Sequence, residues 1–103
     1  MTIQFNTDKT IDWDQRHNDH FSELIKEELD RFSDHITRVE VHLSDENGSK
    51  EGPDDIRCLM EVRVEGRKPI AASNKADTIE QSLTGVISKI KASLSKIVER
   101  FQN

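Results

Sequence analysis

The 103-residue chain contains little of what most specialised structures need. It has one cysteine, Cys58, together with two prolines, one tryptophan and no tyrosine. No apolar run approaches the roughly 18 residues of a membrane span, and the first residues lack the basic flank and apolar stretch of a secretory signal. One thiol forms no internal disulfide, so nothing requires an oxidising compartment. These absences predict a cytoplasmic protein that does not associate with membranes.

Groups that carry out catalysis are equally scarce. No glycine-rich phosphate loop occurs, and Cys58 shares the parity of Ile56 and Met60, which indicates a buried packing residue rather than a nucleophile. His17 and His20 lie three residues apart near acidic neighbours, but solvated histidines explain this spacing better than a metal site does. We therefore expect no enzymatic activity, no small-molecule substrate, no metal and no cofactor.

Charge is abundant and unevenly distributed. The formal net charge is −5, from 15 basic and 20 acidic side chains. Residues 1–60 carry 15 acidic and 7 basic side chains, whereas residues 61–103 carry 5 and 8. The total argues against a polyanionic partner, because phosphate contacts need Lys and Arg, but the second half has the opposite character.

The first half predicts a strand, a helix and a second strand. Ile3 and Phe5 alternate with polar residues, and Asp12 with Gln15 has the spacing of a capping box that would open a helix. Trp13 is interpreted as packing over the end of the core, with stacking on a base as the alternative. The helix carries one apolar stripe, made by Phe21, Ile25, Leu29 and Phe32. The following strand begins at residue 36, and its apolar residues alternate with polar ones: Val39, Val41 and Leu43.

The second half predicts two more strands and a long helix. Residues 45–55 contain no apolar side chain and indicate a flexible acidic loop. Alternation over 56–65, a turn at Gly66 and a short segment at 70–73 indicate a hairpin. Asp77 with Glu80 opens a helix whose apolar residues recur almost to the C-terminus. The expected fold is a single α+β domain over 1–103, a βαβββα two-layer sandwich with both helices on one face of a four-stranded sheet.

One edge of the last helix is basic. Lys89, Lys96 and Arg100 fall on one flank of its apolar stripe, with Ser82 and Ser93 among them. This spacing suits a series of phosphates, although an ordinary solvated helix face is an equally good interpretation. Four other cations could extend the surface: Lys75, Arg63, Arg67 and Lys68.

The chain resembles a known family over residues 36–98. Residues 36–43, Ile-Thr-Arg-Val-Glu-Val-His-Leu, and the Val64-Glu65-Gly66 hairpin are similar to those of the bacterial hibernation-promoting factors and ribosome-associated inhibitors. These proteins are also known as sigma-factor modulation or ribosomal subunit interface proteins. Residues 86–96 match the family's pattern of apolar, apolar, any, Lys, apolar, three variable residues, Leu, any, Lys. Because the chain ends with this helix, it resembles the short forms of the family.

The resemblance implies a fold like that of double-stranded-RNA-binding domains and a protein that binds the small ribosomal subunit and its RNA. Translation would be inhibited under stress or in stationary phase by occupancy of the messenger and transfer-RNA channel, with no reaction catalysed. Lys89 and Lys96 correspond by position to basic contacts of the family. The remaining cations are candidates from charge and geometry alone.

The sequence departs from the family in its charges. Ala92 stands where the family often has a basic residue, and the loop at 45–55 is longer and more acidic. The outer side of the first helix is acidic where family members usually carry Lys and Arg: Asp19, Glu23, Glu27 and Asp30. A competing hypothesis is therefore a protein-interaction module that has lost RNA binding and presents Glu23, Glu27 and Asp30 to a basic partner.

Overall fold

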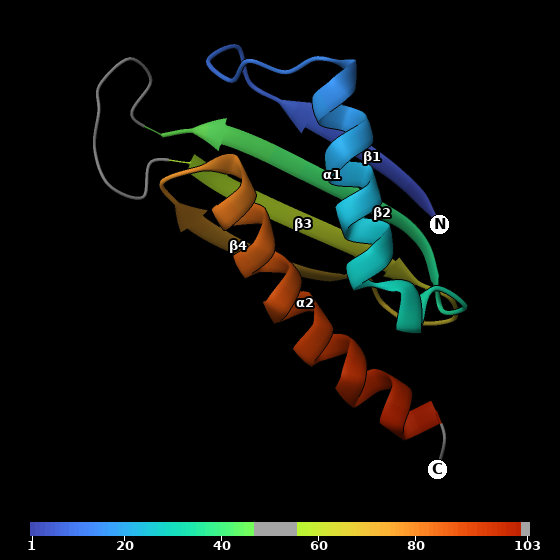
Figure 1. The fold of residues 1–103 in the computed structure, drawn as a ribbon. Coiled ribbons are helices and arrows are strands. Elements are labelled where there is room, and N and C mark those ends of the chain that lie inside the picture. The colour runs from blue at the N-terminus through green and yellow to red at the C-terminus, as the bar shows by residue number, and fades with distance from the viewer. Residues whose placement is uncertain (47–55, 102–103) are drawn as a thin grey trace.

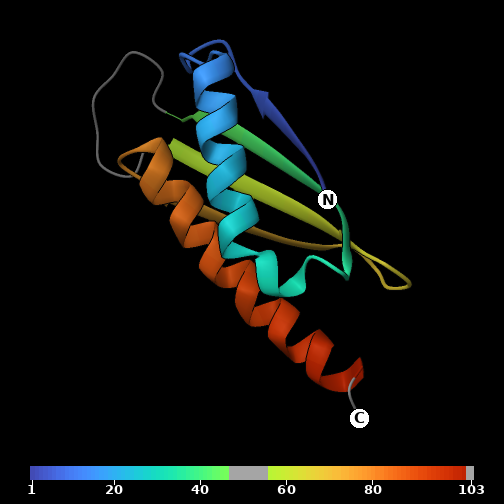
Figure 2. The ribbon, with the colours of Figure 1, turned by 45° about the vertical axis from the view of Figure 1, so that its right-hand side comes forward.

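Four strands, two helices and a short 3-10 helix form two layers in the structure, a computed structural model that describes residues 1–46 and 56–101, apart from the side chains of 100 and 101. The elements are β1 (Thr2–Thr7), α1 (Gln15–Glu28), η1 (Asp30–Phe32), β2 (Ile36–Asp45), β3 (Ile56–Val64), β4 (Ile70–Ala76) and α2 (Ile79–Phe101). Both helices cover one face of the sheet (Figures 1 and 2). The predicted α+β fold is thus confirmed.

The strands lie in the sheet in chain order, β1-β2-β3-β4. β1 is parallel to β2, and the other two pairs are antiparallel. Parallel neighbours need a crossover connection, which α1 supplies between β1 and β2. The last helix runs diagonally across β3 and β4 (Figure 1). The uncovered face of the sheet is the side that the alternating polar residues occupy.

The core lies between the helices and the sheet, where the alternation placed it. Val39, Val41 and Leu43 of β2 are buried, and so are Cys58, Met60 and Val62 of β3. Cys58 is completely covered, and burial raises the pKa of its thiol to about 12. The prediction of a packing cysteine is confirmed, and a thiolate is excluded at neutral pH.

The two helices approach the sheet in different ways. Phe21, Ile25 and Leu29 fill the space beneath α1, together with Phe32 of η1. Beneath α2 lie Leu83, Ile90 and Leu94, and Gly85 of the same helix faces Asn74 of β4. A Cβ atom added at Gly85 would lie 2.1 Å from the Asn74 side-chain nitrogen, so the backbone of α2 lies directly against the Asn74 side chain there.

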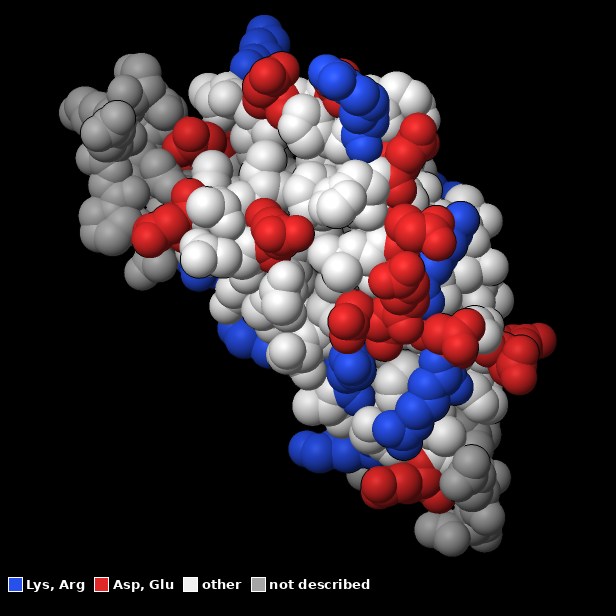
Figure 3. Space-filling model, viewed as in Figure 1, with Lys and Arg blue, Asp and Glu red and all other residues white. Residues whose placement is uncertain are grey.

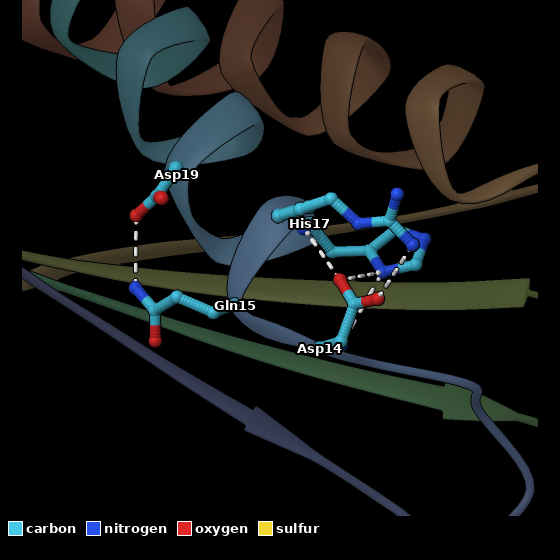
Figure 4. A network of polar contacts seen from close by, with 5 residues as sticks. Asp14, Gln15, His17 and Asp19 are labelled. Carbon is cyan, nitrogen blue, oxygen red and sulfur yellow. Dashed lines mark hydrogen bonds and ion pairs between the residues drawn. The ribbon is translucent and has the colours of Figure 1, made fainter.

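The first helix begins later than the sequence predicted. Asp14, not Asp12, is the N-cap, and its carboxylate accepts the backbone N–H of His17 at 3.0 Å (Figure 4). The His17 ring accepts the Asp14 backbone N–H in return at 3.2 Å, which completes a capping box. The hydrogen bond from the His17 backbone holds the pKa of Asp14 below 3.8, its ordinary value. Histidine is not the Glu or Gln that the sequence pattern requires.

Two other element boundaries differ from those that the sequence predicted. The last helix begins at Ile79, and its capping side chain is that of Thr78, one residue after the predicted Asp77: the Thr78 hydroxyl accepts the Gln81 backbone N–H at 3.1 Å. The last strand continues to Ala76, beyond the predicted segment at 70–73. Most of the predicted loop at 45–55 lies outside the described residues.

Trp13 packs as the first interpretation proposed. Its ring centroid lies 4.9 Å from that of Phe5 and 5.6 Å from that of Phe21, and the side chain is half-buried at the end of the core. Among the Phe and Trp side chains that the structure describes, none is fully exposed, which disfavours the alternative of an aromatic surface open to a nucleobase. In the described part of the chain, no helix has both the length and the apolar character to cross a membrane.

Candidate functional site

The basic edge of α2 is present on the molecular surface. Lys89 and Lys96 are both exposed, and the Lys89 ammonium donates to the Ser73 carbonyl of β4 at 2.7 Å. This bond places the Lys89 charge where α2 meets the edge strand. Among the described side chains, none forms an ion pair or hydrogen bond with Lys96. Arg100 belongs to α2, but its side chain lies outside the described residues.

One of the two predicted hydroxyl groups cannot take part in this edge. Ser82 is completely buried, and its hydroxyl donates to the Ile79 carbonyl at 2.8 Å. The helical wheel placed it beside the lysines, but the close contact of α2 with β4 covers that position. Ser93 is exposed and remains available to a ligand. We call Lys89, Ser93 and Lys96 the α2 edge.

The lysine on the other flank of α2 has a different role. The Lys91 ammonium lies 3.1 Å from a carboxylate oxygen of Glu28, the last residue of α1. Each side chain is a little under half exposed. The pair joins the two helices, and so its charge is matched within the protein.

The other four candidate cations are not gathered beside the α2 edge. Arg63 and Lys75 project from the sheet face that the helices leave uncovered. Arg63 stands between the buried Val62 and Val64 of β3, and Lys75 of β4 lies opposite Arg57, which precedes the buried Cys58. The Lys75 ammonium lies 4.0 Å from Glu46. Arg67 and Lys68 lie in the β3–β4 turn, at the opposite end of β4 from Lys75. That turn and the C-terminal half of α2 are at the same end of the sheet (Figures 1 and 2).

The acidic side of the first helix is also confirmed as a surface. Its members are all exposed, and we call them the acidic α1 surface: Asp19, Glu23, Glu27 and Asp30. Acidic side chains run down the molecule over α1, and basic ones lie along the outer side of α2 (Figure 3). The Asp19 carboxylate accepts from the Gln15 side chain at 2.8 Å (Figure 4). The helix layer therefore presents two neighbouring surfaces of opposite sign.

The uncovered sheet face holds a charge cluster that the sequence analysis missed. Glu40 of β2 lies directly opposite Glu61 of β3, and Arg38 lies opposite Arg63. Arg38 donates to a Glu40 carboxylate oxygen at 2.8 Å and also contacts the Gln4 side chain. The hydrogen bond from Arg38 holds the pKa of Glu40 below its usual range.

A histidine completes this cluster. The His42 Nε2 atom lies 3.7 Å from one oxygen of Glu40 and 3.9 Å from one oxygen of Glu61. Strand alternation predicts the face on which each residue lies. The pairing of Glu40 with Glu61 follows from the β2–β3 register, which a long connection between the strands leaves open to sequence reasoning.

The two histidines considered from the sequence as metal ligands have other partners. His17 interacts with its capping residue Asp14, and the His20 ring lies 3.7 Å from the Glu80 carboxylate of α2. Within residues 1–46 and 56–101, the one group of three converging metal-ligand side chains is Glu40, His42 and Glu61. Neither His17 nor His20 belongs to this group.

Comparison with known proteins adds evidence of a different kind. The model of a family described as "Sigma 54 modulation protein / S30EA ribosomal protein" matches residues 9–102. No curated protein has a sequence that matches the chain.

Known structures share this fold, and they include the following two. The N-terminal domain of Thermus thermophilus Protein Y superposes with a TM-score of 0.75 at 13% identity, covering 94% of this chain and 99% of that one. A ribosomal subunit interface protein from Coxiella burnetii gives 0.71 at 19% identity, covering 96% and 99%. At these identities the two likenesses establish the βαβββα fold.

Proposed function

Because the chain belongs to the sigma 54 modulation protein / S30EA ribosomal protein family, we propose that it binds the small ribosomal subunit and inhibits translation. It would occupy the messenger and transfer-RNA channel during stress or in stationary phase, as a cytoplasmic protein and without catalysing a reaction. The description of the family and the name of the similar Coxiella burnetii protein support a ribosomal partner.

The observation that carries this proposal is the α2 edge. Lys89 and Lys96 stand at the two lysine positions of the family pattern, and both are exposed in the folded chain. Lys96 follows Lys89 by seven positions, which corresponds to ~10 Å along a helix. Two ammonium groups at this spacing, with the Ser93 hydroxyl between them, can contact successive phosphates of an RNA backbone.

The remaining cations divide into stronger and weaker candidates. Arg67 and Lys68 lie at the same end of the sheet as the C-terminal half of α2, so an RNA that follows the α2 edge can reach them. Arg63 and Lys75 face the other side, and Lys75 is near Glu46. We therefore place the main contact on the helix side and at the β3–β4 turn.

The acidic α1 surface restricts how RNA can approach. A phosphate backbone is attracted to the α2 edge and repelled by the carboxylates over α1. The protein would accordingly dock with α2 turned towards ribosomal RNA and with the acidic α1 surface turned away from it. This arrangement allows binding in one orientation despite a net charge of −5.

The direct test reverses the charge of the α2 edge. The double variant Lys89→Glu/Lys96→Glu should no longer co-sediment with purified small ribosomal subunits at low salt. The matched control is Lys9→Glu/Lys26→Glu, which makes the same change in net charge at two exposed residues outside the site and should retain binding. Retained binding by the first variant, or equal loss in both, would contradict the proposed contact.

The second candidate function rests on the acidic α1 surface. Four exposed carboxylates on one side of a helix layer suit a basic protein partner as well as they disfavour RNA. The variant Glu23→Lys/Glu27→Lys/Asp30→Lys separates the hypotheses. If the chain is a ribosomal factor, its co-sedimentation with ribosomes from stationary-phase lysate is retained or increased. If it is a protein-interaction module, it travels at the top of the gradient, and the variant loses its partner.

A further inference from the structure

The charge cluster on the uncovered sheet face contains an arrangement that ordinary sheet pairing disfavours. Glu40 and Glu61 are direct cross-strand partners, and like charges in that relation are destabilising. Arg38 compensates one oxygen of Glu40 through its 2.8 Å bond. The second oxygen of Glu40 and the carboxylate of Glu61 both face His42 instead.

We propose that Glu40, His42 and Glu61 form a binding site for a divalent transition-metal ion of the zinc class. Their ligand atoms, one from each side chain, all lie within 4.8 Å of one another. In a tetrahedral zinc site the ligand atoms lie ~3.4 Å apart, given metal–ligand distances of ~2.0–2.2 Å. The separations of 3.7 Å and 3.9 Å from the His42 nitrogen thus need only small side-chain adjustments.

The surroundings of the three side chains permit this adjustment. Their side chains are 31%, 39% and 47% exposed for Glu40, His42 and Glu61, so they can move and an ion can reach them from solvent. They stand on β2 and β3, the two central strands, whose backbone pairing fixes the spacing of the Cβ atoms.

The donor atoms indicate which ion is preferred. One imidazole nitrogen and two carboxylate oxygens suit zinc and its neighbours, whereas Mg²⁺ and Ca²⁺ prefer sites made of oxygen alone. Cys58 does not compete for the ion, because it is buried on the opposite face of β3. Arg38 would hold Glu40 from the side, as an outer partner that orients a ligand.

The bound ion would change the charge of this face. Arg38 and Arg63 balance Glu40 and Glu61, so with a neutral His42 the cluster has no net charge. A divalent ion makes it cationic. This site is separate from the α2 edge and does not depend on the proposed ribosomal function.

The test is a calorimetric titration of the full chain with ZnCl₂ alone. The wild type should bind one ion per chain, and both His42→Ala and Glu61→Gln should weaken the affinity at least about tenfold. His20→Ala is the matched control, since it removes an exposed histidine paired with a carboxylate elsewhere, and should bind zinc like the wild type. Circular dichroism confirms that each variant is folded.

Several results would overturn the proposal. These are no zinc binding by the wild type, unchanged binding by either folded ligand variant, or a loss in His20→Ala equal to that in His42→Ala. Equal affinity for MgCl₂ would show non-selective attraction to carboxylates and would also overturn it. If His42→Ala does not fold, Glu61→Gln decides the question, because it preserves the shape of the side chain and removes only the charge.

Discussion

α1 and α2 cover the same face of one sheet, yet they differ in both of their own faces. Both helices bury large apolar side chains, but in α2 alone a glycine, Gly85, also brings the helix backbone against a side chain of the sheet, that of Asn74. On the outside, α1 exposes carboxylates and α2 exposes lysines. The buried face of a helix decides its place in the fold, and its exposed face can change sign without disturbing that place. Family membership therefore determines the architecture, while the two outer surfaces determine what can bind.

The largest expected effect on stability concerns the packing beneath α1 and η1. Phe32→Ala removes a completely buried ring from η1 and should lower the free energy of unfolding by about 3–5 kcal/mol, through lost burial and the cavity left behind. Urea denaturation measures this. Arg31→Ala is the neighbouring control: it loses only the guanidinium contact over the same ring at 4.9 Å, and should cost about 1 kcal/mol or less. If the two variants lost similar amounts of unfolding free energy, burial of the Phe32 ring would not be what holds this part of the helix layer on the sheet.

The corresponding change beneath α2 adds volume. Gly85→Ala places a Cβ atom 2.1 Å from the Asn74 side-chain nitrogen, so Asn74 must move, and the expected cost is about 1–3 kcal/mol. The double variant with Asn74→Ala should recover part of this loss, and the recovery is measured as a non-additive change in unfolding free energy. Ser88→Ala, on the exposed side of the same helix, serves as control. A stabilising Gly85→Ala would contradict the close approach.

The charged surfaces differ in how salt acts on them. If the α2 edge binds RNA, Lys96→Gln should reduce the slope of log affinity against log salt by about 1, which is the contribution of one phosphate contact. Glu27→Gln, on the acidic α1 surface, should leave the slope unchanged and raise the affinity slightly. Filter binding to a small-subunit RNA fragment at several salt concentrations measures both. If Lys96→Gln and the wild type had equal slopes, Lys96 would not contact a phosphate.

The smallest expected effect is a difference in how the N-terminal caps of α1 and α2 contribute to stability as the pH changes. Asp14 caps α1 with a carboxylate whose pKa is held below 3.8, whereas α2 is capped by the Thr78 hydroxyl, which does not ionise. The contribution of Asp14 is present above pH ~4 and is lost as the pH falls through its lowered pKa. Asp14→Asn should flatten the acid side of the melting temperature profile. Thr78→Ala should lower the whole profile without changing its shape.

The sequence predicted the elements that depend on local pattern. Val39, Val41 and Leu43 alternate because one face of β2 is buried, and Cys58 follows the same rule in β3. The prediction of the capping residue of α1 was wrong. Aspartates stand on both sides of Trp13, and the reciprocal partner of the true cap, Asp14, is a histidine. Propensity does not distinguish such neighbouring candidates.

The candidate sites were predicted less completely. The lysines of the α2 edge follow from helical spacing and are exposed, but Ser82 was misplaced because its burial depends on the close approach of α2 to β4. The Glu40–His42–Glu61 group could not be found from spacing within one strand. Its members are brought together by the strand register, and the connection over 45–55 does not determine that register.

The parallel pairing of β1 with β2 has a consequence for the order in which the chain folds. Thr2 pairs with Arg38, so this contact closes a long segment, whereas β3 and β4 meet through a short turn. Because long closures are costly in entropy and form late, we expect β2, β3, β4 and α2 to make up the folding nucleus. β1 would then join last and detach first, and its amides would exchange with solvent faster than those of the central strands.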